Sequence, residues 1–218
     1  MRPSILIAIG VAGVTAAACG ATSGTTAGET PAARDSALER AARADSVRSS
    51  YTDADVAFMA GMIHHHAQAL VMSKMAPTHG ASPSLQIMAE RILVGQNDEI
   101  ALMQRWLRDH GQPVPDPADA HAHGTDHSMH MPGMLTAVQM AELDAARGPE
   151  FDRLFLTYMI QHHQGAITMV EELFASHGGA QGDAVFKLAS DIAADQDSEI
   201  TRMRSMLREM MFETESSP

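Results

Sequence analysis

Histidines stand side by side at two places in the sequence, His65–His66 and His162–His163. Methionines lie three, four or seven residues from these pairs, which places them on the same helix faces as the histidines. These residues are Met62, Met72, Met159 and Met169. Thioether sulfur favours Cu(I), and imidazole nitrogen binds both Cu(I) and Cu(II). The two pairs therefore indicate a metal site, and copper is the metal that the donors favour.

A polar pattern is repeated 100 residues apart on two further segments. Its members are Gln96, Glu99 and Met103 in the first segment and Gln196, Glu199 and Met203 in the second. A glutamate that faces a histidine can accept the second ring N–H and orient the ring, so we expect the Gln and Glu residues to support the ligands. Direct ligation by the glutamates is an alternative. In a second interpretation without metal, the histidines and methionines are core packing and the Gln and Glu residues form a solvated face.

The segment between the two halves of the chain is also rich in possible ligands. Residues 121–134 contain four histidines and three methionines, and no Lys or Arg occurs from 109 to 146. The candidate ligands here are His121, His123, His127, His130, Met129 and Met131. A short His-rich tract of this kind is typical of cation capture, although a polar linker without a ligand is the alternative. The connector at 111–134 is long for a compact domain, which indicates a functional or disordered segment.

The composition excludes several classes of protein. The formal net charge of −12 opposes binding to nucleic acid, and the single cysteine excludes a disulfide framework and a multi-cysteine zinc site. A ferritin-type di-iron site needs Glu-x-x-His, and no histidine in the chain has an acidic residue three positions before it. No serine-histidine-aspartate arrangement or phosphate-binding loop is present. We therefore name no catalytic residue and expect ligand exchange rather than catalysis.

Two repeats define the elements that must position these residues. Residues 55–72 match 152–169 at a spacing of 97, and residues 89–107 match 189–207 at a spacing of 100. Apolar residues recur at three and four positions within them, as in helices, so each half is a helical hairpin. Asp53 or Asp55 is a possible N-cap of the first helix. The sequence predicts an all-α, antiparallel four-helix bundle with helices at 53–76, 83–110, 149–177 and 183–211, and a short helix at 136–146.

The N-terminal region has the features of an export signal. Residues 1–18 combine a basic start, a short apolar run and small residues before Cys19. The stretch at 16–19 resembles a lipobox, which predicts lipidation of Cys19, with ordinary cleavage after Ala18 as the alternative. Residues 19–50 then form a flexible tether ahead of a bundle at 51–212. We expect an exported protein of the bacterial periplasm or envelope, attached to the membrane only through a lipid.

Three segments carry a resemblance to the family called domain of unknown function 305 (DUF305). These segments are 62–72, 151–169 and the two Gln-x-x-Glu-Ile-x-x-Met motifs at 96–103 and 196–203. The resemblance spans about residues 51–211 and implies a ferritin-like bundle exported to the envelope, with relatives associated with copper binding. Carried over by position, it implies His65, His66, His162, His163, Met62, Met72, Met159 and Met169 as ligands. His64 is matched by Gln161 in the second half.

These observations support one leading hypothesis and two alternatives. The leading hypothesis is an envelope copper-binding protein that sequesters copper or passes it to an envelope copper-handling partner. The alternatives are a metal-dependent oxidoreductase on the same scaffold and a helical interaction module that binds no metal. The sequence leaves open whether the two half-sites merge or stay separate.

Overall fold

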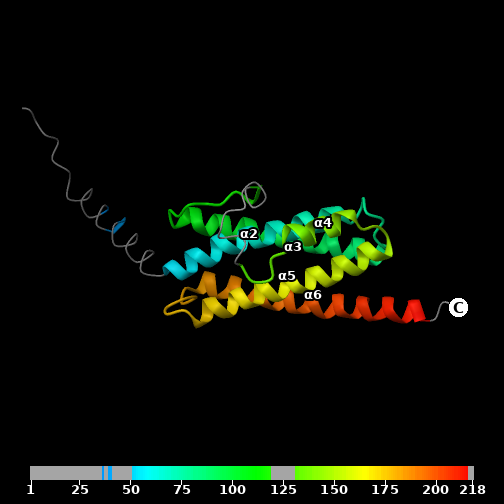
Figure 1. The fold of residues 1–218 in the computed structure, drawn as a ribbon. Coiled ribbons are helices and arrows are strands. Elements are labelled where there is room, and N and C mark those ends of the chain that lie inside the picture. Colours follow the sequence, from blue (N-terminus) through cyan, green and yellow to red (C-terminus); the bar gives the residue numbers. More distant parts are fainter. Residues whose placement is uncertain (1–35, 37–38, 41–50, 119–130, 216–218) are drawn as a thin grey trace, which may run out of the picture. The chain divides into compact units, whose positions relative to one another are not determined.

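The described part of the chain contains four long helices and one short helix in the computed structural model (Figure 1). The structure describes residues 36, 39–40, 51–118 and 131–215. The helices are α2 (Asp53–Met75), α3 (Pro83–Asp109), α4 (Ala137–Ala145), α5 (Pro149–Ala175) and α6 (Asp183–Glu215). No strand occurs in these described ranges. The all-α prediction is confirmed, whereas the predicted signal segment 1–18 and nearly all of the tether 19–50 lie outside the described residues.

The observed helix ends agree with the predicted ends within two residues, except that α6 continues to Glu215 instead of ending near 211. Residues 208–215 contain no glycine or proline, so nothing in the sequence interrupts the helix. The N-cap of α2 is Thr52 rather than Asp53 or Asp55. The Thr52 side chain accepts the Asp55 N–H, and the Asp55 carboxylate accepts the Thr52 N–H, which completes a capping box.

The bundle is assembled from two hairpins, α2–α3 and α5–α6, which meet along α2 and α5. In Figure 1 the first hairpin lies above the second, and α2 and α5 run in opposite directions. Buried apolar side chains form two clusters, and each cluster draws residues from both hairpins. The outer helices α3 and α6 make few direct contacts with each other. One side of the bundle, between α3 and α6, is therefore more open than the side formed by α2 and α5.

Two buried carboxylates tie each hairpin to the turn of the other. Asp55 at the start of α2 accepts the Ala180 N–H at 2.7 Å, and Asp152 at the start of α5 accepts the Ser82 N–H at 3.2 Å. Asp55 and Asp152 are equivalent positions of the repeat, so the two ties are related by a pseudo-twofold axis. These hydrogen bonds fix how far α2 and α5 can slide along each other. They consequently set which residues of α2 and α5 face each other at mid-length.

The end of the connector is seated on α2 and α5. Gln68 on α2 exchanges two hydrogen bonds with the backbone of Leu135, at 2.7 and 3.1 Å. Gly133 adopts a φ of +74° and lies against Gly165 of α5 so closely that a Cβ on Gly165 would stand 2.0 Å from the Pro132 carbonyl oxygen. Glycine is required at Gly165 because any side chain would collide with the connector backbone.

None of the described helices is both long and apolar enough to cross a membrane.

The docked connector gives a prediction for stability. The substitution Gly165→Ala should lower the free energy of unfolding by about 1–3 kcal/mol, because the added methyl displaces the Pro132–Gly133 backbone. Gly95→Ala in α3 is the matched control, since a Cβ there meets nothing within 4 Å. It should stabilise the helix by ~0.5–1 kcal/mol. Urea unfolding of both variants tests this, and equal stability of Gly165→Ala and wild type would show that the connector does not dock there.

Candidate metal centre

Four buried imidazoles meet at the middle of the α2–α5 interface. His65 and His66 come from α2, His162 and His163 come from α5, and none of the four is exposed to solvent. The ring centroids of His65 and His162 lie 3.9 Å apart across the interface. Within each pair the centroids are 6.5 and 6.1 Å apart. The structure thus brings the two half-sites together at the pseudo-twofold axis.

Each of these rings gives its Nε2 hydrogen to an oxygen atom. His66 donates to Glu99 and His163 donates to Glu199, both at 2.7 Å. His65 donates to the backbone carbonyl of Pro132, and His162 donates to the carbonyl of His65, both at 3.0 Å. Because carbonyl and carboxylate oxygens only accept, the hydrogen of each ring is held on Nε2. The prediction that Glu99 and Glu199 face the histidines agrees with these contacts.

The opposite nitrogen of each ring, Nδ1, is buried and has no hydrogen-bond partner. This holds for His65, His66, His162 and His163 alike. Burial and the neighbouring imidazoles lower the pKa of His65 to about 3 and that of His162 well below its usual value. Burial also lowers the pKa of His163, against the opposing effect of Glu199. Neutral rings with the hydrogen on Nε2 leave bare Nδ1 lone pairs in the interior, which is the state of a histidine that binds a metal.

The predicted methionine ligands are all buried, and they are divided between the two apolar clusters. Met62 and Met169 belong to one apolar cluster, whereas Met72 and Met159 belong to the other. Each cluster therefore combines one methionine from α2 with one from α5. The helical spacing in the sequence predicts a different grouping, with Met62 and Met72 in one half and Met159 and Met169 in the other.

Met131 brings a further thioether from the connector to this region. Its sulfur is 3.7 Å from the point where a Cβ of Gly61 would stand, and the Met169 methyl is 3.4 Å from the same point. Gly61 precedes His65 by four residues, or about one helical turn. The other connector ligands predicted from the sequence lie outside the described residues: His121, His123, His127, His130 and Met129.

In the described residues, the four histidines do not form a preassembled metal site. No group of three or more His, Cys, Asp or Glu side chains in the described part of the chain is arranged to hold a metal ion. A metal site at these rings would therefore need donors of another type, such as thioether sulfur. The sequence does not predict the Pro132 and His65 carbonyls as acceptors, because a backbone carbonyl has no residue-type signature.

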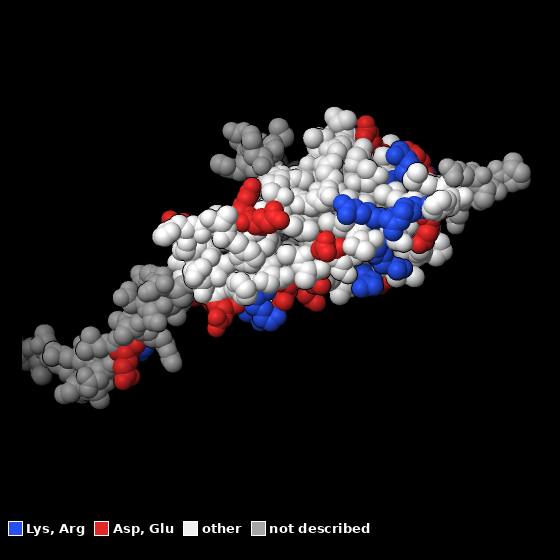
Figure 2. All heavy atoms as spheres, turned by 90° about the horizontal axis from the view of Figure 1, so that it is seen from below, with Lys and Arg blue, Asp and Glu red and all other residues white. Residues whose placement is uncertain are grey.

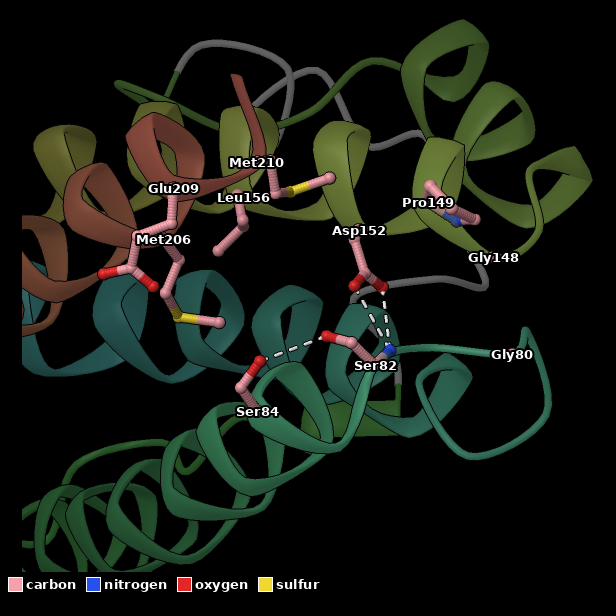
Figure 3. Close-up of a pocket in the computed structure, with 10 residues that line it drawn as sticks. All are labelled: Gly80, Ser82, Ser84, Gly148, Pro149, Asp152, Leu156, Met206, Glu209 and Met210. Atoms are coloured by element: carbon pink, nitrogen blue, oxygen red, sulfur yellow. Dashed lines mark hydrogen bonds between the residues drawn. The ribbon is translucent and has the colours of Figure 1, made fainter. Parts of the chain in front are cut away.

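A pocket of about 430 Å³ (Figure 3) is lined by none of the four histidines. It is lined by the starts of α3 and α5 and the end of α6, roughly 15 Å along α5 from His162. Gly148, Met206 and Met210 line it. The equivalent positions of the first half hold three rings that pack together, Tyr51, Trp106 and His110. The pocket thus arises where the second half lacks aromatic side chains.

Comparisons with known proteins agree with the fold. The profile of the family described as "Domain of unknown function (DUF305)" matches residues 55–214. A DUF305 fragment from Deinococcus radiodurans is 28% identical, with a TM-score of 0.62 over 73% of this chain and 98% of its own. A DUF305 protein from Streptomyces coelicolor, named as a candidate secreted protein, is 26% identical, with a TM-score of 0.61 over 72% of this chain and 93% of its own.

Copper-bound structures of a protein called CopM are also similar. The Cu(II)-bound form is 29% identical, with a TM-score of 0.58 over 71% of this chain and 96% of its own, and a Cu(I)-bound form is 28% identical. A bacterioferritin-related protein from Bacteroides fragilis has a TM-score of 0.60 at 10% identity, over 80% of this chain and 96% of its own. That likeness shows the fold alone and confirms the ferritin-like prediction. No curated protein matches the chain.

The lowered imidazole pKa values predict that the metal-free protein loses stability in acid. Below the usual pKa of 6.5 the unfolded chain binds a proton at His65, whereas the folded chain, where the pKa of His65 is about 3, does not, and the lowered pKa values of His162 and His163 act in the same direction. Stability should therefore fall as pH drops below about 6.5 toward 5, by up to ~1.4 kcal/mol per pH unit for His65. Thermal unfolding across this range measures the effect.

His162→Gln is the control for this prediction, because it removes one of the titrating groups and should make the loss shallower. A stability that stays level between pH 7 and pH 5 would contradict the buried, neutral state of these rings.

Proposed function

The chain belongs to the DUF305 family, and we propose that it is a copper-binding protein that holds copper among the paired histidines and the buried methionines. The observation that carries this proposal is the set of four unpartnered Nδ1 atoms in the α2–α5 interface. Leaving a buried polar atom without a partner costs about 1–3 kcal/mol. Four such atoms in one interface favour a function that uses them, and metal binding is the function for which their lone pairs are suited.

The donor set favours copper over other metals. Structural zinc sites usually include thiolate, and the only cysteine is Cys19, far from the bundle in sequence. Hard cations such as Mg²⁺ and Ca²⁺ prefer oxygen ligands, whereas the interior offers imidazole nitrogen and thioether sulfur. The Cu(I)-bound and Cu(II)-bound forms of CopM support the same choice.

The residues of the site have separable roles in this proposal. His65, His66, His162 and His163 supply nitrogen from Nδ1, and the methionines Met62, Met72, Met159 and Met169 supply sulfur. Glu99 and Glu199 hold the Nε2 hydrogens of two rings, which fixes their orientation and makes Nδ1 a stronger donor. Because Nδ1 carries no hydrogen, copper binds there without releasing a proton. The chemistry is ligand exchange, which suits sequestration or transfer to an envelope partner.

The connector supplies a second set of ligands in the proposal. Its histidines and methionines at 121–131 would collect copper from solution or from a partner. Met131 supports a link to the bundle, since its sulfur lies beside Met169 above Gly61.

The binding prediction is tested by titrating copper into the full chain against a competing chelator. The double variant His65→Gln/His162→Gln should weaken binding at the bundle at least about tenfold, because it removes two of the four nitrogens. His177→Gln, at an exposed histidine in the α5–α6 turn, is the matched control and should bind as wild type does. Circular dichroism confirms that each variant is folded.

A third variant separates the two sets of ligands. Serine in place of His121, His123, His127, His130, Met129 and Met131 should remove the connector's share of the copper and leave the bundle's share. If the histidine double variant retains full affinity and stoichiometry, the bundle is not the site.

We also propose that the protein is exported and anchored through a lipid on Cys19. The export signal at 1–18 supports this, as does the Streptomyces coelicolor relative named as a candidate secreted protein. Expressed in a bacterial host, the wild-type chain should fractionate with membranes, and Cys19→Ser should not. Cys19→Ser that remains with the membranes would overturn the anchor, while Ser23→Ala in the same region serves as the control.

A further inference from the structure

The open side of the bundle holds a polar pocket that leads toward the histidines. It has a volume of about 190 Å³ and is lined only by residues of α3 and α6. On the opposite side, along α2 and α5, the Pro132 carbonyl lies on His65. That side has a pocket of about 260 Å³ near the start of α2 and the end of α5, whereas the α3–α6 pocket is the one lined by the two glutamates that contact the buried rings.

Two residues connect this pocket with the buried rings. Glu99 and Glu199 both line the pocket, and each accepts the Nε2 hydrogen of a fully buried histidine. Their side chains retain 13% and 20% exposure, whereas the rings they contact have none. Each carboxylate thus spans the boundary between solvent and the imidazole cluster.

The pocket also contains buried amide groups without partners. Gln96 is 3% exposed and Gln196 is 2% exposed, and both line the pocket. Neither amide atom of Gln96 has a hydrogen-bond partner, nor does the amide oxygen of Gln196. Buried amides are normally satisfied, so these two side chains indicate a polar ligand independently of the carboxylates. The amide oxygens of these side chains can coordinate a cation.

The charge of the pocket selects a cation. Three carboxylates line it, from Glu99, Asp195 and Glu199, against one cationic residue, Arg91. Burial and the nearby Glu99, Glu199 and Asp191 raise the pKa of Asp195, which reflects the concentration of negative charge. On the face seen from below, acidic side chains are spread along the surface, while most Lys and Arg lie toward one end (Figure 2).

We infer that the α3–α6 pocket is a capture site, where a hydrated copper ion is held by carboxylate and amide oxygens before it moves to the buried imidazoles. The inference rests on the proposed function and names the route to the same site. Along this route the ion exchanges water for oxygen of Glu99 or Glu199, and then exchanges oxygen for nitrogen and sulfur. Its oxidation state does not change, and no proton is released at Nδ1.

Asp195 and Asp197 offer a matched pair for testing this route. Both are exposed residues of α6 with the same charge, but only Asp195 lines the pocket. Copper binding to the full chain is followed by stopped flow through quenching of Trp106, the single tryptophan. At low ionic strength, Asp195→Asn should slow association several-fold and Asp195→Lys by about tenfold, because the pocket attracts the ion electrostatically. The final copper occupancy should not change.

The corresponding variants of Asp197 should associate with copper at the wild-type rate, and added salt should reduce the difference between the two positions. Repeating the measurement with the connector ligands replaced by serine isolates uptake by the bundle. Equal rates for the Asp195 and Asp197 variants, with copper still bound in the bundle, would overturn the capture site alone. Failure of the bundle to bind copper at all would overturn both this route and the proposed function.

Discussion

The structure depends on one constraint: four imidazoles are packed in a buried interface with their hydrogens committed to Nε2. Two carboxylates and two backbone carbonyls accept those hydrogens. The four Nδ1 lone pairs are consequently confined where no donor of the described protein satisfies them. Such an arrangement is unfavourable for folding and persists only because the surrounding structure enforces it. The apolar clusters and the ties from Asp55 and Asp152 supply that enforcement.

Duplication explains how one chain builds this arrangement. A single hairpin offers two adjacent histidines that point in different directions from one helix, with a glutamate on the partner helix. Two copies related by a pseudo-twofold axis place His65 against His162, so that each half completes the other. The halves then diverge in two places. The connector covers the α2–α5 side, and the aromatic cluster around Trp106 has no counterpart near Met206.

Much of the fold and part of the site could be predicted from the sequence. Helical spacing and the two repeats gave the helices, the bundle and the contact of Glu99 and Glu199 with the histidines. Spacing fixes the face of a helix but not its rotation against a neighbour, so the meeting of His65 with His162 and the sorting of Met62 with Met169 needed the structure. The cap at Thr52 was missed although Thr-x-x-Asp is a capping-box pattern. The hydrogen bond that the Pro132 carbonyl accepts could not be predicted, because every residue type carries a backbone carbonyl.

The proposal that the four buried rings bind metal through Nδ1 is tested most directly by the nitrogen NMR spectrum of the histidine rings during titration with Ag(I), a diamagnetic substitute for Cu(I). We expect that Nδ1 of His65, His66, His162 and His163 carries no hydrogen in the free protein. Silver should shift these Nδ1 signals and leave the Nε2–H signals in place. Silver bound in stoichiometric amount with all four rings unchanged would contradict the account.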